Sequence, residues 1–488
     1  MAVGSLSVKT FSISAIARQK EGVDVVVNGN GYKYDGTIDI YGAARLNGAE
    51  TLTLTNINFK HAGSDHDFIS CNTTDSEKRY AHNVTVENCT FVGDVTYDVV
   101  AMRFRQCYNI RVKNVNAKNM HSLMWETGVE GILIDNVTIT DSKNGVSFGG
   151  TTSAVVKNSN ISATQGYALR MDGNSESSLK VENSTMTAGK PIIVRKMTGT
   201  CDVTLGTGVI LNTDAAYQIV FTNGEDDAAY VAPTGNYTIV GAESFKVYGR
   251  DMHVSSQEEF ENALKGGKVE NVYLRSGSYI IPQGAKGKTI RFVGEDNPEE
   301  VVVTVTKVGT GGENCDYGLD GSTVTFEGIT ITTNSSTYIG YAGCKGTYRN
   351  CIINGTYTLY DNSSFDGCTF NVSGDVYNIW TWGASVANFT NCTFNSDGKA
   401  MLLYGTADTQ LTIENTVFND KGGLTDKKAA IEIGNDYSKS YKLVVNNTTV
   451  NGYEINDKGI NTGTTLWGNK DSMGKDKLNV VVDGVNVY

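Results

Sequence analysis

Histidine, arginine and carboxylate side chains gather in one early part of the chain, where they could transfer protons. Four of the five histidines lie close together in sequence: His61, His66, His82 and His121. Arg103 and Glu126 alternate with apolar residues in two short segments, so we expect both on an outward face. There Arg103 would neutralise a substrate carboxylate while His66 or His121 takes or gives a proton, with Glu126 beside them. The alternative is that Arg103 and Glu126 form a structural ion pair and that the histidines are solvated loop residues.

Two carboxylates beside His66 offer a minimal metal site. Asp65 and Asp67 flank this histidine in a long loop, because Asn56 and Asn88 are 32 residues apart. They could hold Ca²⁺, but a hard cation takes six or more oxygen ligands. The sequence has no Cys-x-x-Cys pair and no histidine-rich spacing typical of zinc. We therefore expect no cofactor, with Ca²⁺ as the metal that this loop could hold.

A second group of residues is rich in aromatic rings. Trp380 and Trp382 alternate in one segment, so their side chains share a face. Tyr377 precedes them and Tyr404 follows about one repeat later. On an outward face these rings would form a platform on which sugar rings stack, and on an inward face they would fill the core. An outward pair buries Ile379 and an inward pair exposes it, so the sequence does not decide between the two.

A short phrase that begins with asparagine recurs along the chain and indicates the elements that must position these groups. It follows a β-branched segment each time, and its asparagines are Asn88, Asn114, Asn136, Asn158, Asn183 and, later, Asn350, Asn391 and Asn415. The spacings in the first set are 26, 22, 22 and 25 residues. This period is that of a coil in a stacked β-solenoid and not of a helical repeat. The sequence therefore predicts an all-β fold.

The residue before each asparagine predicts the register of the stack. In successive repeats it is Glu87, Lys113, Asp135, Lys157 and Glu182, and in the second half it is Glu327, Arg349 and Asp366. In parallel coils about 4.8 Å apart, this alternation places unlike charges next to each other. We expect these residues to form structural pairs, each contributing less than about 1 kcal/mol.

A second segment of each early repeat is expected to pair with its counterpart in the next coil. Aligning Val100, Leu123, Val146 and Leu169 predicts that Met102, Trp125, Phe148 and Met171 are buried and that Arg103, Glu126 and Asp172 are exposed. Arg103 and Glu126 would then be neighbours on adjacent coils.

Composition limits the partners and the location. A net charge of -12 disfavours nucleic acid, which needs clustered lysine and arginine. No stretch approaches the roughly 20 apolar residues that span a bilayer, so we expect no membrane insertion. The first residues, Met1 to Gly4, show neither the basic nor the apolar region of an export signal, so we expect either that a signal was removed or that the protein reaches its site without one. We expect an extracellular or cell-surface bacterial protein, or a phage virion component.

The nine cysteines, several of them in repeat segments, are expected to be small buried residues and not disulfides.

The array is interrupted near residue 250. The segment 256–259 has the pattern of a capping box, and an amphipathic helix over about 255–265 follows, ending at two glycines. A helix at this point would shield the open end of a solenoid. We predict one parallel β-helix over residues 1–249 and a second over 250–488 with this helix as its cap.

The phrase Asn88-Cys89-Thr90-Phe91, the asparagine ladder and the segment 27–38 resemble the right-handed parallel β-helix proteins of the pectate-lyase-like superfamily. The resemblance covers nearly the whole chain and implies two consecutive right-handed parallel β-helices. This superfamily includes polysaccharide lyases, glycoside hydrolases, bacterial adhesins and phage tailspikes, so the activity stays open. The segments 212–214 and 226–227 resemble parts of polygalacturonase motifs, but only 12 residues separate them and the rest of that signature is missing.

The resemblance implies a polysaccharide or cell-surface glycan as the partner. We expect a solenoid that engages glycans as an adhesin or display scaffold. One alternative is an enzyme that cleaves an acidic polysaccharide, a lyase more readily than a hydrolase, in which Arg103 neutralises a uronate. Another is a structural spacer without a ligand. The oligomeric state is open, and a homotrimer is among the options.

Overall fold

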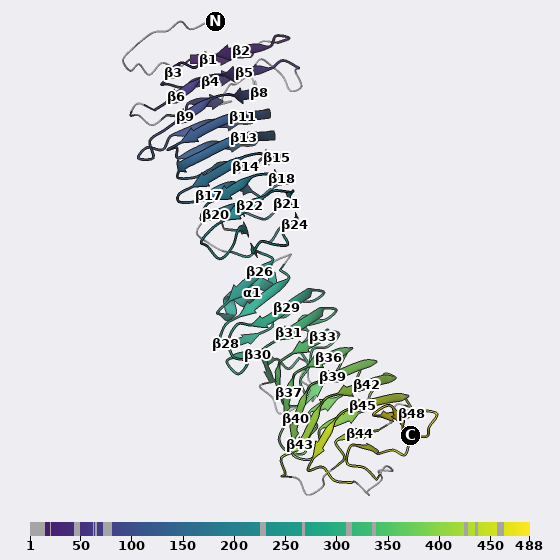
Figure 1. Ribbon diagram of the computed structural model, residues 1–488. Helices are drawn as coiled ribbons and strands as arrows, with labels where there is room; N and C mark the ends of the chain where they lie inside the picture. The colour runs from purple at the N-terminus through teal and green to yellow at the C-terminus, as the bar shows by residue number, and fades with distance from the viewer. Residues whose placement is uncertain are drawn as a thin grey trace. The chain divides into compact units, whose positions relative to one another are not determined.

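The computed structural model describes residues 15–19, 21–42, 49–61, 63, 66–71, 81–224, 231–265, 269–308, 315–333, 338–423, 428–434, 438–455 and 463–488. They form two compact units that divide between Arg250 and Asp251. Within each unit, short parallel strands stack coil upon coil (Figure 1). The predicted parallel β-helix fold is confirmed.

Each coil passes through three walls, which we number from the asparagine corner. Wall 1 is the strand before the corner, wall 2 is the strand after it, and wall 3 is the strand beyond the next loop. In one coil of the first unit these are β18 (Ser177–Glu182), β19 (Thr185–Thr187) and β20 (Lys190–Arg195). Because each strand pairs with the same wall of the coils before and after it, a side chain on any wall belongs to a row that runs along the stack.

The strands of the first unit fall into these walls as follows. Wall 1 contains β2 (Val25–Asn28), β5 (Leu52–Thr55), β8 (His82–Glu87), β11 (Tyr108–Lys118), β13 (Glu130–Ser142), β15 (Ala154–Lys157), β18, β21 (Thr200–Leu205) and β24 (Asn236–Val240). Wall 2 contains β3 (Lys33–Tyr34), β6 (Asn58–Lys60), β9 (Thr90–Val92), β16 (Asn160–Ala163), β19 and β22 (Ile210–Asn212), with the later halves of β11 and β13. Wall 3 contains β1 (Ala15–Arg18), β4 (Ile38–Tyr41), β7 (Ile69–Cys71), β10 (Val100–Arg105), β12 (Ser122–Thr127), β14 (Val146–Gly149), β17 (Tyr167–Asp172), β20, β23 (Ile219–Phe221) and β25 (Val247–Tyr248).

The second unit begins with β26 (Asp251–Val254) and the helix α1 (Gln257–Lys265) and then follows the same order. Wall 1 contains β26, β27 (Asn271–Leu274), β29 (Thr289–Gly294), β31 (Thr323–Glu327), β33 (Lys345–Arg349), β36 (Ser363–Asp366), β39 (Val386–Thr390), β42 (Thr409–Glu414), β45 (Tyr441–Asn446) and β48 (Leu478–Val482). Wall 2 contains β28 (Gly277–Ile280), β30 (Val301–Val305), β32 (Thr330–Thr333), β34 (Ile352–Asn354), β37 (Thr369–Asn371), β40 (Thr393–Ser396), β43 (Val417–Asp420) and β46 (Thr449–Asn451). Wall 3 contains β35 (Tyr357–Thr358), β38 (Ile379–Trp380), β41 (Met401–Leu403), β44 (Ile431–Ile433) and β47 (Trp467–Asn469). A 3₁₀ turn (Tyr317–Leu319) and β49 (Val485–Asn486), antiparallel to β48, complete the described elements.

The recurring asparagine is the corner between walls 1 and 2. All eight asparagines of the phrase have a positive φ, between 42° at Asn183 and 56° at Asn136. This left-handed conformation strains most residues, and asparagine tolerates it better than other residues with a side chain. Gly328 (φ 63°) and Gly367 (φ 65°) take the corner in two coils of the second unit. The repeat therefore marks a backbone requirement.

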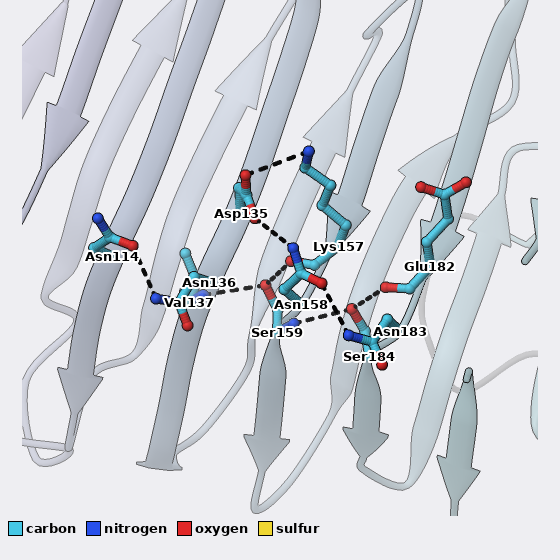
Figure 2. A network of polar contacts seen from close by, with 10 residues as sticks. All are labelled: Asn114, Asp135, Asn136, Val137, Lys157, Asn158, Ser159, Glu182, Asn183 and Ser184. Carbon is cyan, nitrogen blue, oxygen red and sulfur yellow. Dashed lines mark hydrogen bonds and ion pairs between the residues drawn. The ribbon is translucent and has the colours of Figure 1, made fainter. Parts of the chain in front are cut away.

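The corner side chains also bond from coil to coil. The Asn114 amide donates to Asn88 Oδ1 at 3.1 Å, and the Asn136 amide donates to Asn114 Oδ1 at 2.8 Å. Further along, Asn158 donates to Asp135 at 2.8 Å and itself accepts from Asn183 at 2.9 Å (Figure 2). Each coil is thereby held to the one before it at the same point.

The residue after the asparagine extends this bonding into the wall. Ser159 Oγ accepts from the Val137 amide at 3.1 Å and donates to the Lys157 carbonyl at 2.8 Å (Figure 2). Ser184 makes the same two bonds one coil later, to Ser159 and Glu182. Other corners carry cysteine here, as at Cys89 and Cys392. All nine cysteines are buried and free of disulfides, as predicted.

The charge alternation gives the register correctly. Lys113 pairs in register with Glu87 on one side and Asp135 on the other, and Lys157 pairs with Asp135 and Glu182. The Lys157 ammonium lies 3.4 Å from the Asp135 carboxylate. In the second unit Arg349 likewise lies between Glu327 and Asp366 in the ladder.

The second segment of each early repeat, for which we aligned Val100 with Leu123, is wall 3. This alignment is wrong by one residue in β12. Ser122, and not Leu123, pairs with Val100, so that Met124 lies beside Met102. Alternation from Met124 then carries Trp125 outward and Glu126 inward, the reverse of the prediction. Met102, Phe148 and Met171 are buried as predicted. The loop between walls 2 and 3 varies in length, and residues on both faces of β12 are buried, so its apolar pattern does not define a register.

The helix α1 begins and ends close to the predicted bounds. Ser256 Oγ accepts from the Glu259 amide at 3.3 Å, while the Glu259 carboxylate accepts from the Ser255 amide at 2.7 Å. Phe260 is buried against Tyr279 and Phe292 of the second unit. In the part of the chain that the structure describes, no helix has the length and apolar character needed to cross a membrane.

Replacing Asn114 tests the corner. Asn114→Ala keeps the strained φ of 52° and loses two amide bonds, so it should lower the free energy of unfolding by about 1–3 kcal/mol. Asn114→Gly relieves the backbone strain but loses the same hydrogen bonds. Its free energy of unfolding should therefore lie between those of the alanine variant and the wild type. Urea unfolding followed by circular dichroism measures both variants. A glycine variant less stable than the alanine variant would contradict the role of the corner conformation.

Candidate functional site

The outward face of wall 3 in the first unit carries a row of cationic and aromatic side chains. Ser70, Arg103, Trp125, Ser147 and Arg170 occupy this row on successive coils. The Arg103 guanidinium lies 5.3 Å from the Trp125 ring, and the Arg170 guanidinium lies 5.2 Å from the same ring. Both distances are in the range of cation–π attraction. The indole therefore holds two guanidinium groups together.

The small Ser147 lets Arg170 reach toward Trp125 across the coil that separates them. Arg170 Nε donates to Ser147 Oγ at 3.1 Å, and its guanidinium also lies 4.6 Å from the Tyr167 ring. Only 8% of Arg170 is exposed. A guanidinium so enclosed between rings has a fixed position, as carboxylate binding requires.

Arg103 is oriented by Asp67 and not by Glu126. Its Nε lies 2.6 Å from Asp67 Oδ2, and its Nη2 lies 3.3 Å from Asp67 Oδ1. The predicted pairing of Arg103 with Glu126 is wrong, because Glu126 points into the core. Asp67 is bound to an arginine instead of being directed toward a metal, and Asp65 lies outside the described residues. Among the described residues no group of three or more His, Cys, Asp or Glu side chains could hold a metal ion.

His121 lies beside this row at the start of β12. Its Nε2 is 3.9 Å from Asp98 Oδ1, and the Lys143 ammonium is 3.9 Å from the same oxygen. Burial lowers the pKa of His121, the Asp98 carboxylate raises it, and Lys143, Arg170 and Arg103 lower it further. The imidazole is therefore neutral near neutral pH and can accept a proton.

The Nδ1 atom of His121 is buried and has no hydrogen-bond partner in the structure. An unpartnered buried polar atom is costly and calls for an explanation, and a bound ligand is one. Ser122 Oγ also lacks a partner, but Ser122 pairs in the ladder with Val100 and shares the inward face of β12 with Met124, so it belongs to the core. The position of His121 beside two arginines makes the outward face the best candidate site of the first unit.

The other histidines lie apart from His121 in the contacts they make. His66 Nε2 is 3.7 Å from Asp35, and its ring packs against His61 and Phe68. His82 is buried in wall 1, with Nε2 3.5 Å from the Glu50 carboxylate. Of the two predicted proton carriers, His121 lies within the electrostatic influence of Arg103 and Arg170, whereas the contacts of His66 include Asp35, His61 and Phe68. The segment 226–227 lies outside the described residues.

Glu126 is a core residue, which excludes it from an outward site. It is 0% exposed, and it pairs in the ladder with Phe104 and Phe148. Burial raises the pKa of Glu126 to about 8, although the hydrogen bond that Thr151 donates to Oε1 acts to lower it. Oε2 has no partner. The carboxyl is therefore largely protonated at neutral pH.

The sequence prediction missed Arg170, Trp125 and Lys143 as site residues. Arg170 had a signal, because it is a lone arginine in an apolar wall 3 segment three coils after Arg103. Trp125 had none, since its place depends on the register of β12. Lys143 lies in the loop before β14 and reaches the site only through the stacking of coils.

The four predicted aromatic residues of the second unit lie on one outward face of its wall 3. Trp380 points outward, because Ile379 before it is 0% exposed in the core. The Trp380 ring lies 5.0 Å from Trp382 and 6.1 Å from Tyr404. Tyr377 donates a 2.5 Å hydrogen bond to Glu432 on the same face. The outward alternative for the tryptophan pair is the correct one.

Comparison with known proteins gives little beyond the fold. No protein-family model matches the chain, and no curated protein matches it. Among solved structures, the PL6 family alginate lyase AlyGC aligns at 10% identity and a TM-score of 0.29, covering 97% of both chains. A mutant of the same lyase aligns at 10% identity and a TM-score of 0.24, covering 90% of this chain and 86% of that one. Likenesses this distant carry no argument about activity, which has to come from the site itself.

Replacing Glu126 tests its protonation. The folded chain keeps the Glu126 proton up to about pH 8, whereas the ordinary pKa is 4.5, so the folded chain binds more protons between these values. Stability should therefore fall as pH rises through this window, by up to a few kcal/mol. Glu126→Gln should remove this part of the pH dependence. Urea midpoints of both proteins at pH 5 and pH 8 measure it, and equal pH dependence in the two would contradict the buried neutral carboxyl.

Proposed function

We propose that the protein cleaves an acidic polysaccharide by β-elimination on the outward face of wall 3 in the first unit. The observation that carries this proposal is the half-buried imidazole of His121 among three cations, beside the enclosed Arg170. β-Elimination from a uronic acid needs a cation at the carboxylate and a neutral base near the carbon that bears the acidic proton. This group of residues supplies both.

The residues divide the reaction between them. Arg170, with Arg103 held by Asp67, binds the uronate carboxylate and stabilises the charge that develops when C5 loses its proton. His121 accepts that proton. The electron pair left on C5 forms the double bond to C4, and the C4–O bond to the next sugar breaks. The leaving oxygen takes a proton from the Lys143 ammonium, and the products are a saturated and an unsaturated end.

A binding role without cleavage uses the same residues. Two guanidinium groups on a rigid wall would retain an acidic glycan whether or not His121 acts on it. This is the adhesin or display-scaffold function. The observation in its favour is the ion pair of Arg103 with Asp67, which leaves this guanidinium less able to stabilise the charge that cleavage would develop. The two functions differ in the appearance of an unsaturated product.

Activity should depend on His121. On a panel of soluble polyuronates, we expect the wild type to release products that absorb in the ultraviolet through their new double bond. His121→Ala should lower kcat by about 10²–10⁴-fold. His253→Ala is the matched control, because His253 lies in the second unit against Glu295 and should leave the rate unchanged. Retention of wild-type activity in His121→Ala would overturn the assignment, and binding without product would support the adhesin.

The pH profile tests the electrostatics of His121. Since its pKa is lowered from 6.5, the acidic limb of kcat/KM should lie below that value. Asp98→Asn removes the carboxylate that raises this pKa, so the limb should move to still lower pH. A limb that moves to higher pH in Asp98→Asn would show that His121 is not the titrating base.

A further inference from the structure

The outward row of wall 3 in the second unit consists of Thr358, Trp380, Leu402 and Glu432 on successive coils. The residues that alternate with them fill the core: Tyr357, Ile379, Met401 and Ile431 are at most 2% exposed. The row therefore faces away from the core. It occupies the same wall, counted from the asparagine corner, as the arginine row of the first unit.

The ring of Trp380 has a fixed orientation at the centre of this row. Its Nε1 donates to the Tyr404 carbonyl at 3.0 Å. Tyr338 meets the ring at 4.8 Å with an interplanar angle of 65°, and Trp382 meets it at 5.0 Å with an angle of 70°. Trp380 itself is neither buried nor fully exposed. A rigid, half-exposed indole is a surface that the apolar face of a sugar ring can cover.

Glu432 lies in the outward row and is nevertheless only 2% exposed. Its Oε2 accepts from the Tyr377 hydroxyl at 2.5 Å, but its Oε1 is buried and has no partner. Burial raises the pKa of Glu432, while Tyr377 and three lysines, Lys428, Lys470 and Lys399, lower it. Lys399 is itself paired with Asp375.

A second unpartnered polar atom lies at the other end of the row. Thr358 Oγ1 is buried, in a residue 2% exposed, and it has no hydrogen-bond partner. Leaving such atoms unsatisfied costs about 1–3 kcal/mol each. Thr358 and Glu432 are three coils apart, which is about 14 Å at the spacing of parallel strands. A ligand that satisfies both must be longer than one sugar and must run along the stack.

We propose that this row is a second, non-catalytic carbohydrate site that holds a neutral oligosaccharide. Sugar rings lie over Trp380 and Leu402, and hydroxyl groups donate to Glu432 Oε1 and Thr358 Oγ1. The row itself contains no cation, whereas the arginine row contains Arg103 and Arg170, so it suits a neutral sugar better than a uronate. Binding here is independent of cleavage in the first unit and uses none of its residues.

Titration of the full chain with neutral hexasaccharides tests this site. The probes are hexamers of β-linked glucose, xylose, mannose and galactose, with a hexuronate for comparison, followed by calorimetry in the His121→Ala background so that no probe is cut. We expect at least one neutral hexamer to bind, with an affinity that changes little between low and high salt, because no ion pair is required. If no neutral hexamer binds, or if only the hexuronate binds and is released by salt, the proposal is wrong.

Two substitutions assign the binding to this row. Trp380→Ala should weaken binding by at least tenfold, and the nearly isosteric Glu432→Gln should weaken it by about tenfold because it places an amide nitrogen or a poorer acceptor at one of the two oxygens. Glu414→Gln, an exposed wall 1 residue of the same unit, is the matched control and should bind as the wild type does. Circular dichroism verifies folding, and since Glu432→Gln keeps shape and volume, wild-type binding by that variant would overturn the assignment even if Trp380→Ala fails to fold.

Discussion

The structure depends on coil-to-coil hydrogen bonding between parallel strands, kept in register by one left-handed corner per coil. Asparagine meets both demands of this corner, because it tolerates a positive φ and its amide bonds to the coil before it. Where glycine replaces it, as at Gly328, the conformation is kept without the amide. Every outward or inward row of side chains follows from this registration.

In such a molecule a binding or catalytic site is built from a row of side chains that runs along one wall of the stack. Side chains that are more than 20 residues apart in sequence become neighbours, and a contact can skip a coil if the residue between is small. Ser147 allows this, since it lets Arg170 share the indole of Trp125 with Arg103. In both units the candidate sites are on wall 3, where the strands follow loops of variable length. Walls 1 and 2 are tied directly to the corner and carry mainly structural pairs and ladders.

The same difference between walls explains what the sequence could and could not predict. Next to the corner, the register follows from the asparagine spacing, and the charge alternation through Lys113 and Lys157 was predicted correctly. On wall 3 the loop length is free, and an apolar pattern on both faces does not distinguish one register from the next. Because of the one-residue error in β12, Trp125 was predicted to be in the core and Glu126 on the outward face, and the structure has the reverse. Whether Trp380 faced outward depended on how its neighbour Ile379 fitted the core, which only the packed coils decide.

The corner also constrains how such a chain can change in length. Because corner amides such as those of Asn114 and Asn136 bond to the corner one coil away, a segment can be gained or lost without disturbing the ladder only as a whole coil. Partial insertions must be confined to the loops before and after wall 3. The separation of Trp125 from Arg170 can thus change only in steps of one coil, so a duplication between them would separate Arg170 from the ring that it shares with Arg103. Variation in ligand preference among chains built this way should come from exchange of side chains on wall 3 and from its loops, and not from gradual lengthening of the stack.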